Sequence, residues 1–326
     1  RDYYASRGLG DVYKRQGLFM SLNVILGGLE LGFIYGIMAL GLYISFRIMN
    51  VPDLTTEGSF TLGLAVSAVV ANENHSWLGI LLAFLAGCCA GFVTGFLQTK
   101  MRIHPILAGI ISMCGLYSVN LMILGSPNVN IPKDSRVFTS VDNLFDNIGL
   151  DIFGRHNAKM ILSFVAVVVC VLVMIWFFRT HFGLCLRATG NNEDMVRASS
   201  INVDVSKIVA LMLANGLIAL SGSFIAQYQG YADISSGNGI LVVGLASVII
   251  GEAIMGKRGV TLGLISAIVG SVIYRFIITW VINSGIFTAQ VIRLITAIIV
   301  AVALSIPAFK YYIARFKIKH GGGRNA

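Results

Sequence analysis

The chain has 326 residues, of which 56% are apolar and 12% are charged, and its mean hydropathy is +0.81. A soluble globular domain cannot bury so large an apolar fraction, so the composition indicates an integral membrane protein. The formal net charge of +9 does not indicate nucleic-acid binding, because the Lys and Arg residues lie in short loops between apolar spans and in the tail. The five cysteines form no CxxC pair and predict neither a disulfide framework nor a metal site.

Residues 1–18 differ from the rest of the sequence. They are charged and aromatic without any period, and they precede a candidate native start at Met20. We expect them to be a non-native or disordered leader, since a targeting signal would carry an apolar core and a cleavage site.

Nine apolar segments, each near the roughly 20 residues that cross a bilayer, follow between residues 19 and 309. They predict an all-α polytopic membrane protein with about nine transmembrane helices, in a range of eight to ten. Gly87, Gly91 and Gly95 recur at a spacing typical of close helix packing in lipid. Residues 310–326 are expected to form a basic cytoplasmic tail. The predicted spans are Phe19–Phe46, Thr56–Ala71, Trp77–Leu97, Pro105–Leu124, Ala158–Phe178, Ile208–Gln227, Asn238–Met255, Val260–Val281 and Phe287–Ala308.

The positive charges predict the orientation of these spans. With the C-terminal tail inside, most Lys and Arg residues fall in inner loops, as the positive-inside rule requires. Nine spans then put the native N-terminus outside. The segment Gly125–Asn157 becomes an outer loop, which is either simply solvated or in contact with an extracytoplasmic partner.

A polar segment, Arg187 to Lys207, interrupts the apolar sequence between the fifth and sixth spans, on the predicted cytoplasmic side. A mere connection needs only a few residues, whereas this segment is long enough to hold a small surface helix over Asn191–Ser200. We interpret it as a docking element for a separate soluble protein. Its helix signals are a cap at Thr189, Asn191 or Asn192, acidic residues Glu193 and Asp194 in the first turn, and Arg197 near the end.

A short pattern occurs twice in the chain. Asp53-Leu-Thr-Thr followed by Gly63-Leu-Ala has a counterpart in Asp233-Ile-Ser-Ser followed by Gly244-Leu-Ala. Each copy precedes a glycine-interrupted apolar segment with one long span ahead and two behind. We therefore predict a 4+1+4 architecture, two groups of four spans in opposite orientation joined by a linking span. Inverted repeats with interrupted helices are how many transporters build alternating access.

Polar and ionisable side chains at these positions are candidates for a translocation pathway, although they could equally cap broken helices. The candidates are Glu30, Asp53, Thr55, Thr56, Glu57, Ser59, Asp233, Ser235, Ser236 and Asn238. Glu252, Arg275 and Arg293 lie near span ends, where a structural ion pair or a snorkelled side chain is favoured. Tyr228 and Tyr231 are expected in an interfacial aromatic belt.

The polar segment resembles the cytoplasmic coupling segment of ABC-importer permeases of the branched-chain amino acid and simple-sugar type, with the approximate pattern R-A-x-G-x-N-x-x-x-A-R-x-x-G-I. The matching run is Gly183-Leu-Cys-Leu-Arg-Ala-Thr-Gly-Asn-Asn-Glu-Asp-Met-Val-Arg-Ala-Ser-Ser-Ile-Asn-Val, although Ser200 stands where glycine is common. The likeness continues through Asn215-Gly-Leu-Ile-Ala-Leu-Ser-Gly and covers nearly everything after Met20. The stretch Asn50-Val-Pro-Asp-Leu-Thr-Thr-Glu-Gly-Ser-Phe is most similar to a subgroup linked to aromatic, tryptophan-like amino acids.

The resemblance implies a permease subunit of an ATP-driven importer in the bacterial plasma membrane, which moves a small polar nutrient, above all an amino acid, by alternating access. It implies a second permease subunit, identical or paralogous, a cytosolic ATPase dimer that carries ATP-Mg, and an extracytoplasmic substrate-binding protein. This chain would bind no cofactor and would not itself be an enzyme. The coupling residues that it implies are Arg187, Gly190, Asn191, Asn192, Glu193, Asp194, Arg197, Ala198, Ser200 and Ile201, within a coupling segment at 183–206.

Two other functions stay open at this point. An ion-coupled secondary transporter would use Glu30 or Glu57 to couple a gradient to solute movement. A membrane enzyme or scaffold is opposed by the lack of a recognisable nucleophile–base or metal-ligand spacing.

Overall fold

The computed structural model describes residues 22–147, 155–256 and 259–283, together with 294, 297, 298, 300–302 and 305. The predicted leader, the predicted tail and most of the predicted ninth span lie outside the described residues.

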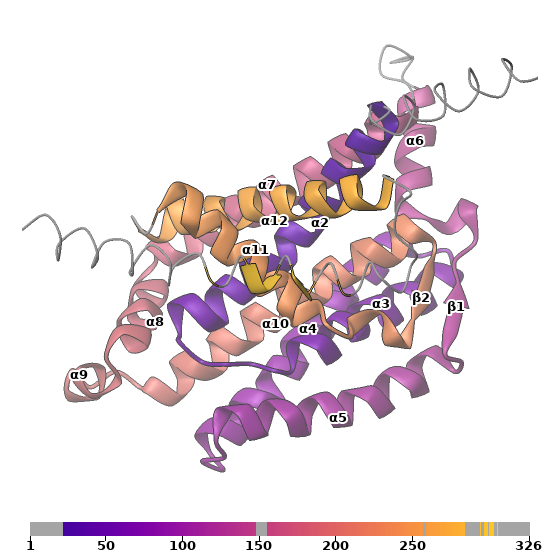
Figure 1. Ribbon diagram of the computed structural model, residues 1–326. Coiled ribbons are helices and arrows are strands. Elements are labelled where there is room, and N and C mark those ends of the chain that lie inside the picture. The colour runs from indigo at the N-terminus through magenta and orange to yellow at the C-terminus, as the bar shows by residue number, and fades with distance from the viewer. Residues whose placement is uncertain are drawn as a thin grey trace, which may run out of the picture.

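The described chain is almost entirely helical, as Figure 1 shows. The first half comprises α2 (Leu22–Leu42), the π-helix η1 (Tyr43–Ile48), α3 (Thr56–Asn72), α4 (Ser76–Thr99), α5 (Pro105–Leu124), β1 (Asn128–Asn130), η2 (Lys133–Ser135) and α6 (Val137–Asn147). The second half comprises α7 (Arg155–Arg179), α8 (His181–Asn191), α9 (Glu193–Ala198), α10 (Val203–Gln229), β2 (Tyr231–Asp233), η3 (Ile234–Gly237), α11 (Ile240–Met255) and α12 (Val260–Asn283).

Seven segments in the described part of the chain are long and apolar enough to cross a membrane. The predicted all-α polytopic membrane fold is therefore confirmed. α3 matches the predicted second span but has only 17 residues, fewer than the roughly 20 that a bilayer requires. The count of nine and the repeat architecture stay predictions. The seven segments are Asn23–Ile48, Ser76–Thr99, Pro105–Leu124, Lys159–Arg179, Val203–Gln229, Ile234–Met255 and Val260–Asn283.

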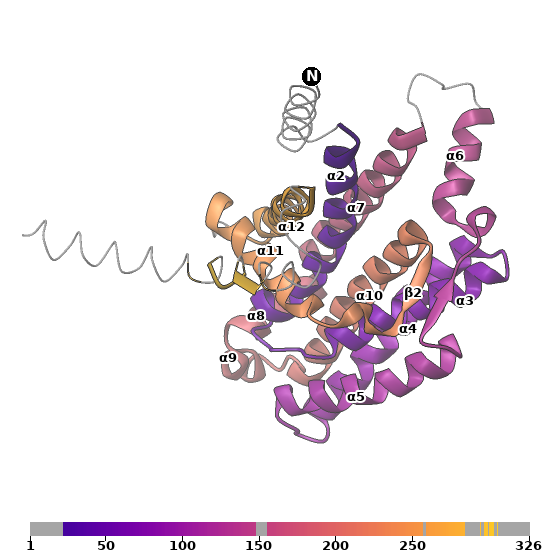
Figure 2. The ribbon, with the colours of Figure 1, turned by 45° about the vertical axis from the view of Figure 1, so that its right-hand side comes forward.

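The central helix is α10. Its most apolar window is 72% buried, whereas the corresponding windows of α5 and α7 are 22% buried. α10 packs against α4, α3 and α2, and α12 packs against α2 and α11. Figures 1 and 2 show α5 and α7 on opposite outer sides of the bundle. The helices that surround α10 are thus placed mainly by their contacts with it.

Small residues allow α4 to approach α10 closely, as the glycine spacing predicted. Gly87, Gly91 and Gly95 all face α10. A Cβ on Gly91 would overlap the Leu211 carbonyl, and a Cβ on Gly95 would lie 2.9 Å from the Cα of Ile208. Because these contacts involve backbone atoms, rotation of a side chain cannot relieve them.

Residues 125–147 of the predicted outer loop contain β1, η2 and α6, and several of them, among them Asn128, Lys133 and Asp134, are exposed. β1 pairs antiparallel with β2, and Val129 lies opposite Ala232. The Ile131 N–H donates to the Gly230 carbonyl at 2.8 Å, and the Val137 N–H donates to Gln227 Oε1 at 3.2 Å. These hydrogen bonds fasten the segment to the end of α10.

The two polar ends of the bundle are far apart. α6 lies at one end of the molecule and α9 at the other in both ribbon views (Figure 2). The arrangement agrees with the orientation deduced from charge, in which the segment with α6 is outside and the segment with α9 is inside.

We predict that Gly91→Val lowers the stability of the purified protein by about 1–3 kcal/mol, because an added side chain forces α4 away from α10. The matched control is Gly115→Val in α5, since a Cβ at Gly115 meets nothing within 4 Å. Thermal unfolding in detergent measures the difference. Equal melting temperatures for the two variants would contradict the α4–α10 packing described above.

Candidate functional site

Two short helices follow α7 at the end predicted to be cytoplasmic. α8 is capped by the Thr180 hydroxyl. α9 begins after Asn192, whose Oδ1 accepts a hydrogen bond from the Met195 N–H at 3.1 Å. Of the predicted caps, Asn192 is therefore correct, whereas Thr189 and Asn191 lie inside α8. The predicted surface helix is present as α9, and the structure adds α8, which ends at Asn191 just before it.

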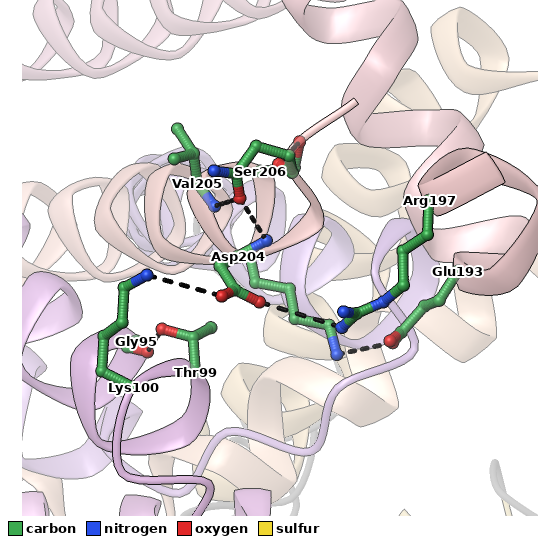
Figure 3. Close-up of polar contacts among 10 residues, drawn as sticks. Gly95, Thr99, Lys100, Glu193, Arg197, Asp204, Val205 and Ser206 are labelled. Carbon is green, nitrogen blue, oxygen red and sulfur yellow. Dashed lines mark hydrogen bonds and ion pairs between the residues drawn. The ribbon is translucent and has the colours of Figure 1, made fainter. Parts of the chain in front are cut away.

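Charged side chains hold α9 against its neighbours. Glu193 Oε1 lies 2.6 Å from Lys207 Nζ, which joins the start of α9 to α10. Asp204, in the first turn of α10, lies between Arg197 at 3.8 Å and Lys100 at 3.5 Å, as Figure 3 shows. Single exposed ion pairs contribute little, about 0–1 kcal/mol each. Two of these pairs join α9 to α10, and the third joins the first turn of α10 to the end of α4.

Most of α9 faces solvent. Val196 is buried, whereas the Met195 side chain is 55% exposed and Asp194 and Ala198 are exposed beside it. Ser200, which follows the helix, has φ +60°, a left-handed conformation that favours glycine. This conformation gives a physical reason for the glycine that the family pattern has at this position.

α8 is anchored to η1 by a close backbone contact. Gly190 lies against the Ile48 carbonyl so tightly that a Cβ would overlap it. The Asn50 side-chain amide also donates to the Gly190 carbonyl at 3.3 Å, and Leu186 is fully buried. A glycine is required at position 190 because any side chain would push α8 away from η1.

An ion pair extends this contact to α11. Arg47 Nε of η1 lies 2.5 Å from Glu252 Oε1 of α11. A cavity of about 280 Å³ lies beside the pair and is lined by Tyr43, Arg187 and Asn191 among others. The expectation that Glu252 forms a structural ion pair is confirmed, and three of the predicted coupling residues, Arg187, Gly190 and Asn191, line the same cavity.

The first copy of the repeated pattern forms a buried polar network. Asp53 accepts hydrogen bonds from the Thr55 N–H at 2.9 Å and from the Asn215 side-chain amide at 2.6 Å. Ser59 Oγ donates to Asn215 Oδ1 at 2.7 Å, and the hydroxyls of Thr55 and Thr94 are 2.8 Å apart. These side chains tie the start of α3 to α10 and α4.

The second copy folds in the same local way and meets the first. Asp233 Oδ1 accepts from the Ser235 N–H at 2.8 Å, as Asp53 does from the N–H two residues later. Glu57 Oε1 accepts from the Gly239 N–H at 3.0 Å, which joins the first turn of α3 to the residue that precedes α11. The two short patterns, distant in sequence, are thus in contact.

A cavity of about 240 Å³ lies beside Glu57, and we refer to it as the Glu57 cavity. The sequence predicted two of its residues, Glu57 and Asn238, and missed the contribution of α5. Asn120 is an amide within the apolar span of α5, and a polar side chain at such a position could have indicated that α5 contributes to a site. The cavity is lined by Glu57, Gly58, Thr61, Met113, Cys114, Tyr117, Asn120, Ile234 and Asn238.

The remaining predicted pathway residues lie elsewhere. Glu30 is 3% exposed and accepts a hydrogen bond from the Tyr228 hydroxyl at 2.8 Å. The Tyr228 ring packs edge-on against Phe138, with centroids 5.7 Å apart. Tyr228 thus joins α10 to α2 and α6, and its expected place in an interfacial aromatic belt stays a prediction. Of the others, Thr56 is buried, Ser236 is half-buried and Ser235 is exposed, and the coupling residue Ile201 is half-buried.

Comparison with known proteins shows the family of this chain. Residues 24–308 match the family described as "Branched-chain amino acid transport system / permease component". The chain belongs to this permease family. The permease is 37% identical over 273 residues to the tyrosine transport system permease protein of Clostridioides difficile (strain R20291), covering 83% of this chain and 87% of the relative.

More distant relatives transport other solutes. The permease is 25% identical over 261 residues to the ribose import permease protein RbsC of Escherichia coli (strain K12), covering 79% of this chain and 78% of RbsC. It is 24% identical over 281 residues to the probable branched-chain amino acid transport permease protein LivH of Methanocaldococcus jannaschii, covering 84% of this chain and 86% of LivH. No solved structure matches the permease.

These relationships confirm the predicted family. The permease is a multi-pass subunit of an ABC importer in the cytoplasmic membrane. The secondary-transporter and scaffold alternatives are not retained.

We predict that Tyr228→Phe destabilises the permease by about 1.5–3 kcal/mol, because it removes a hydrogen bond to a buried carboxyl group. Tyr231→Phe is the matched control, since Tyr231 is 39% exposed. Thermal unfolding in detergent should show a melting temperature several degrees lower for the first variant only. A shift of the same size in both variants would mean that the Tyr228–Glu30 hydrogen bond does not contribute the predicted stability.

Proposed function

We propose that this permease imports an amino acid, most specifically an aromatic one, driven by ATP hydrolysis on a separate subunit. The complete transporter would contain two permease subunits, a cytosolic ATPase dimer that binds ATP-Mg, and an extracytoplasmic substrate-binding protein. This chain itself would bind no nucleotide. The observation that carries the proposal is the α8–α9 pair, a fixed and exposed cytoplasmic element on a chain of this family.

Two sets of contacts would transmit a displacement of α8 and α9 to the membrane-spanning helices. The ion pairs of Glu193 and Arg197 connect α9 to the first turns of α10. α8 connects through Gly190 to η1, and η1 connects through Arg47 to Glu252 of α11. A pull on α8 and α9 would therefore act on α10 and α11 together.

Both connections end at the interrupted helices. α10 bears Asn215, which binds Asp53 ahead of α3. α11 begins next to Gly239, which binds Glu57 in α3. Rearrangement of α10 against α11 would change the contact between the starts of α3 and α11, which is where transporters with interrupted helices bind their solute. We propose that this contact opens alternately to the two sides of the membrane.

The proposed substrate class has support from the relatives. The tyrosine transport permease is 37% identical to this chain, whereas the ribose permease is 25% identical. The identity favours an aromatic amino acid over a sugar.

The function is tested by uptake into proteoliposomes that contain the permease, its ATPase and its binding protein. We expect uptake of labelled tyrosine or tryptophan that requires ATP, and no competition by excess ribose. Uptake without ATP, down an ion gradient, would contradict the proposal. So would transport of ribose in preference to the amino acids.

We predict that Met195→Asp weakens binding of the ATPase by about 30-fold or more, a loss of at least about 2 kcal/mol, because it places a charge on the exposed apolar side chain of α9. Met195→Leu is the matched control, because it keeps an apolar side chain at the same place. Co-purification and ATPase stimulation by the binding protein measure the effect. An ATPase that remains bound to the aspartate variant would show that α9 is not the docking element.

A further inference from the structure

We infer that the Glu57 cavity binds the α-ammonium group of the transported amino acid, through the Glu57 carboxylate and the Asn120 side-chain carbonyl. The inference rests on the proposed function, because it assumes that an amino acid passes along α3 and α5. It adds the recognition chemistry, which neither the family nor the relatives assign.

Glu57 gives the cavity a negative charge. Its side chain is half-buried in the first turn of α3, and one carboxylate oxygen accepts the Gly239 N–H at 3.0 Å. A carboxylate has lone pairs for several donors, so capacity for a ligand remains. None of the residues that line the cavity in the described chain is Lys or Arg. A cationic group on the solute would supply the missing positive charge.

Asn120 offers a second acceptor at the same place. It is 1% exposed, and its amide nitrogen donates to the Gly58 carbonyl at 3.1 Å. Since a carbonyl oxygen can only accept, this hydrogen bond fixes the orientation of the amide. Asn120 Oδ1 then has no hydrogen-bond partner among the described residues, although it is buried. A buried acceptor without a donor costs about 1–3 kcal/mol, and an ammonium group that entered the cavity would satisfy it.

The other residues that line the cavity match the side chain and the carboxylate of an aromatic amino acid. Met113, Tyr117 and Ile234 supply apolar and aromatic surface, and the Asn238 amide supplies a donor for the solute carboxylate. The volume of about 240 Å³ is below the roughly 300 Å³ at which pockets for drug-sized ligands begin, which suits a small metabolite. A neutral sugar would leave the charge on Glu57 uncompensated.

The position of the Glu57 carboxylate also indicates which surroundings border the cavity. An ionised carboxylate against lipid hydrocarbon is costly, so this side of α3 must border water or protein. Cys114 and Tyr117, which line the same cavity from α5, are exposed in the single chain. Cys114 is therefore a native reporter of occupancy.

The test measures the rate at which a water-soluble thiosulfonate modifies Cys114 in the permease–ATPase complex in nanodiscs. Cys88, Cys89, Cys170 and Cys185 are first replaced by Ala so that Cys114 is the remaining thiol. The probes are L-tyrosine, tyramine, which lacks the carboxylate, and 3-(4-hydroxyphenyl)propionate, which lacks the ammonium group. We expect tyrosine and tyramine to slow the modification, and the propionate to have no effect.

Glu57→Gln should raise the tyrosine concentration that gives half-protection by about tenfold or more, because it removes the charge. The glutamine keeps an oxygen that can accept the Gly239 N–H, so the start of α11 stays in place. Glu73→Gln, at the exposed other end of α3, is the matched control and should leave protection unchanged.

Protection by the propionate equal to that by tyrosine would overturn the ammonium assignment, and so would full protection in Glu57→Gln. The analogue series needs no change at Glu57, so the inference stays falsifiable if that variant does not fold. Loss of all protection while ATP-driven tyrosine uptake persists would refute this site and leave the proposed function standing. Loss of both would refute both.

Discussion

The buried amide of Asn215 is the contact on which the rest of the arrangement depends. It lies on α10, the most buried of the seven candidate membrane spans in the described chain, and it binds both Asp53 and Ser59 from a segment more than a hundred and fifty residues earlier. A buried carboxyl group is strongly disfavoured unless its oxygens are satisfied, and here both oxygens are. The start of α3 can therefore lie among apolar helices only because α10 presents this amide at the right depth.

Several other features follow from the position at which α3 starts. Once Asp53 is held, Glu57 lies one turn further along α3, close enough to accept the Gly239 N–H. That contact places the start of α11, whose far end bears Glu252 and its ion pair with η1. A polar contact beside α10 and an ionic contact at the end predicted to be cytoplasmic thus belong to one connected framework, and the same framework holds α8.

The sequence predicted the features that depend on local chemistry. The cap at Asn192, the acidic start of α9, the close packing at Gly91 and the pairing of Glu252 all follow from residue type and spacing. It did not predict features that depend on contacts between distant segments. The hydrogen bond between Tyr228 and Glu30 joins residues 198 positions apart, so nothing in the sequence around either residue indicated it. The part of α5 that lines the Glu57 cavity was also missed, although Asn120, an amide within an otherwise apolar span, marks the face that meets α3.

The π-helix η1 has a consequence for how this chain can vary. A π-helical turn holds about one residue more than an α-helical turn, so the residues after it are rotated by roughly 100° relative to a continuous α-helix. Arg47 and Ile48 occupy that turn, and each meets a different partner, Glu252 and Gly190. Deleting a single residue from this turn would restore regular winding and swing both away from their partners at once. Insertions and deletions here should therefore be tolerated far less than substitutions, even though the segment touches neither solute nor nucleotide.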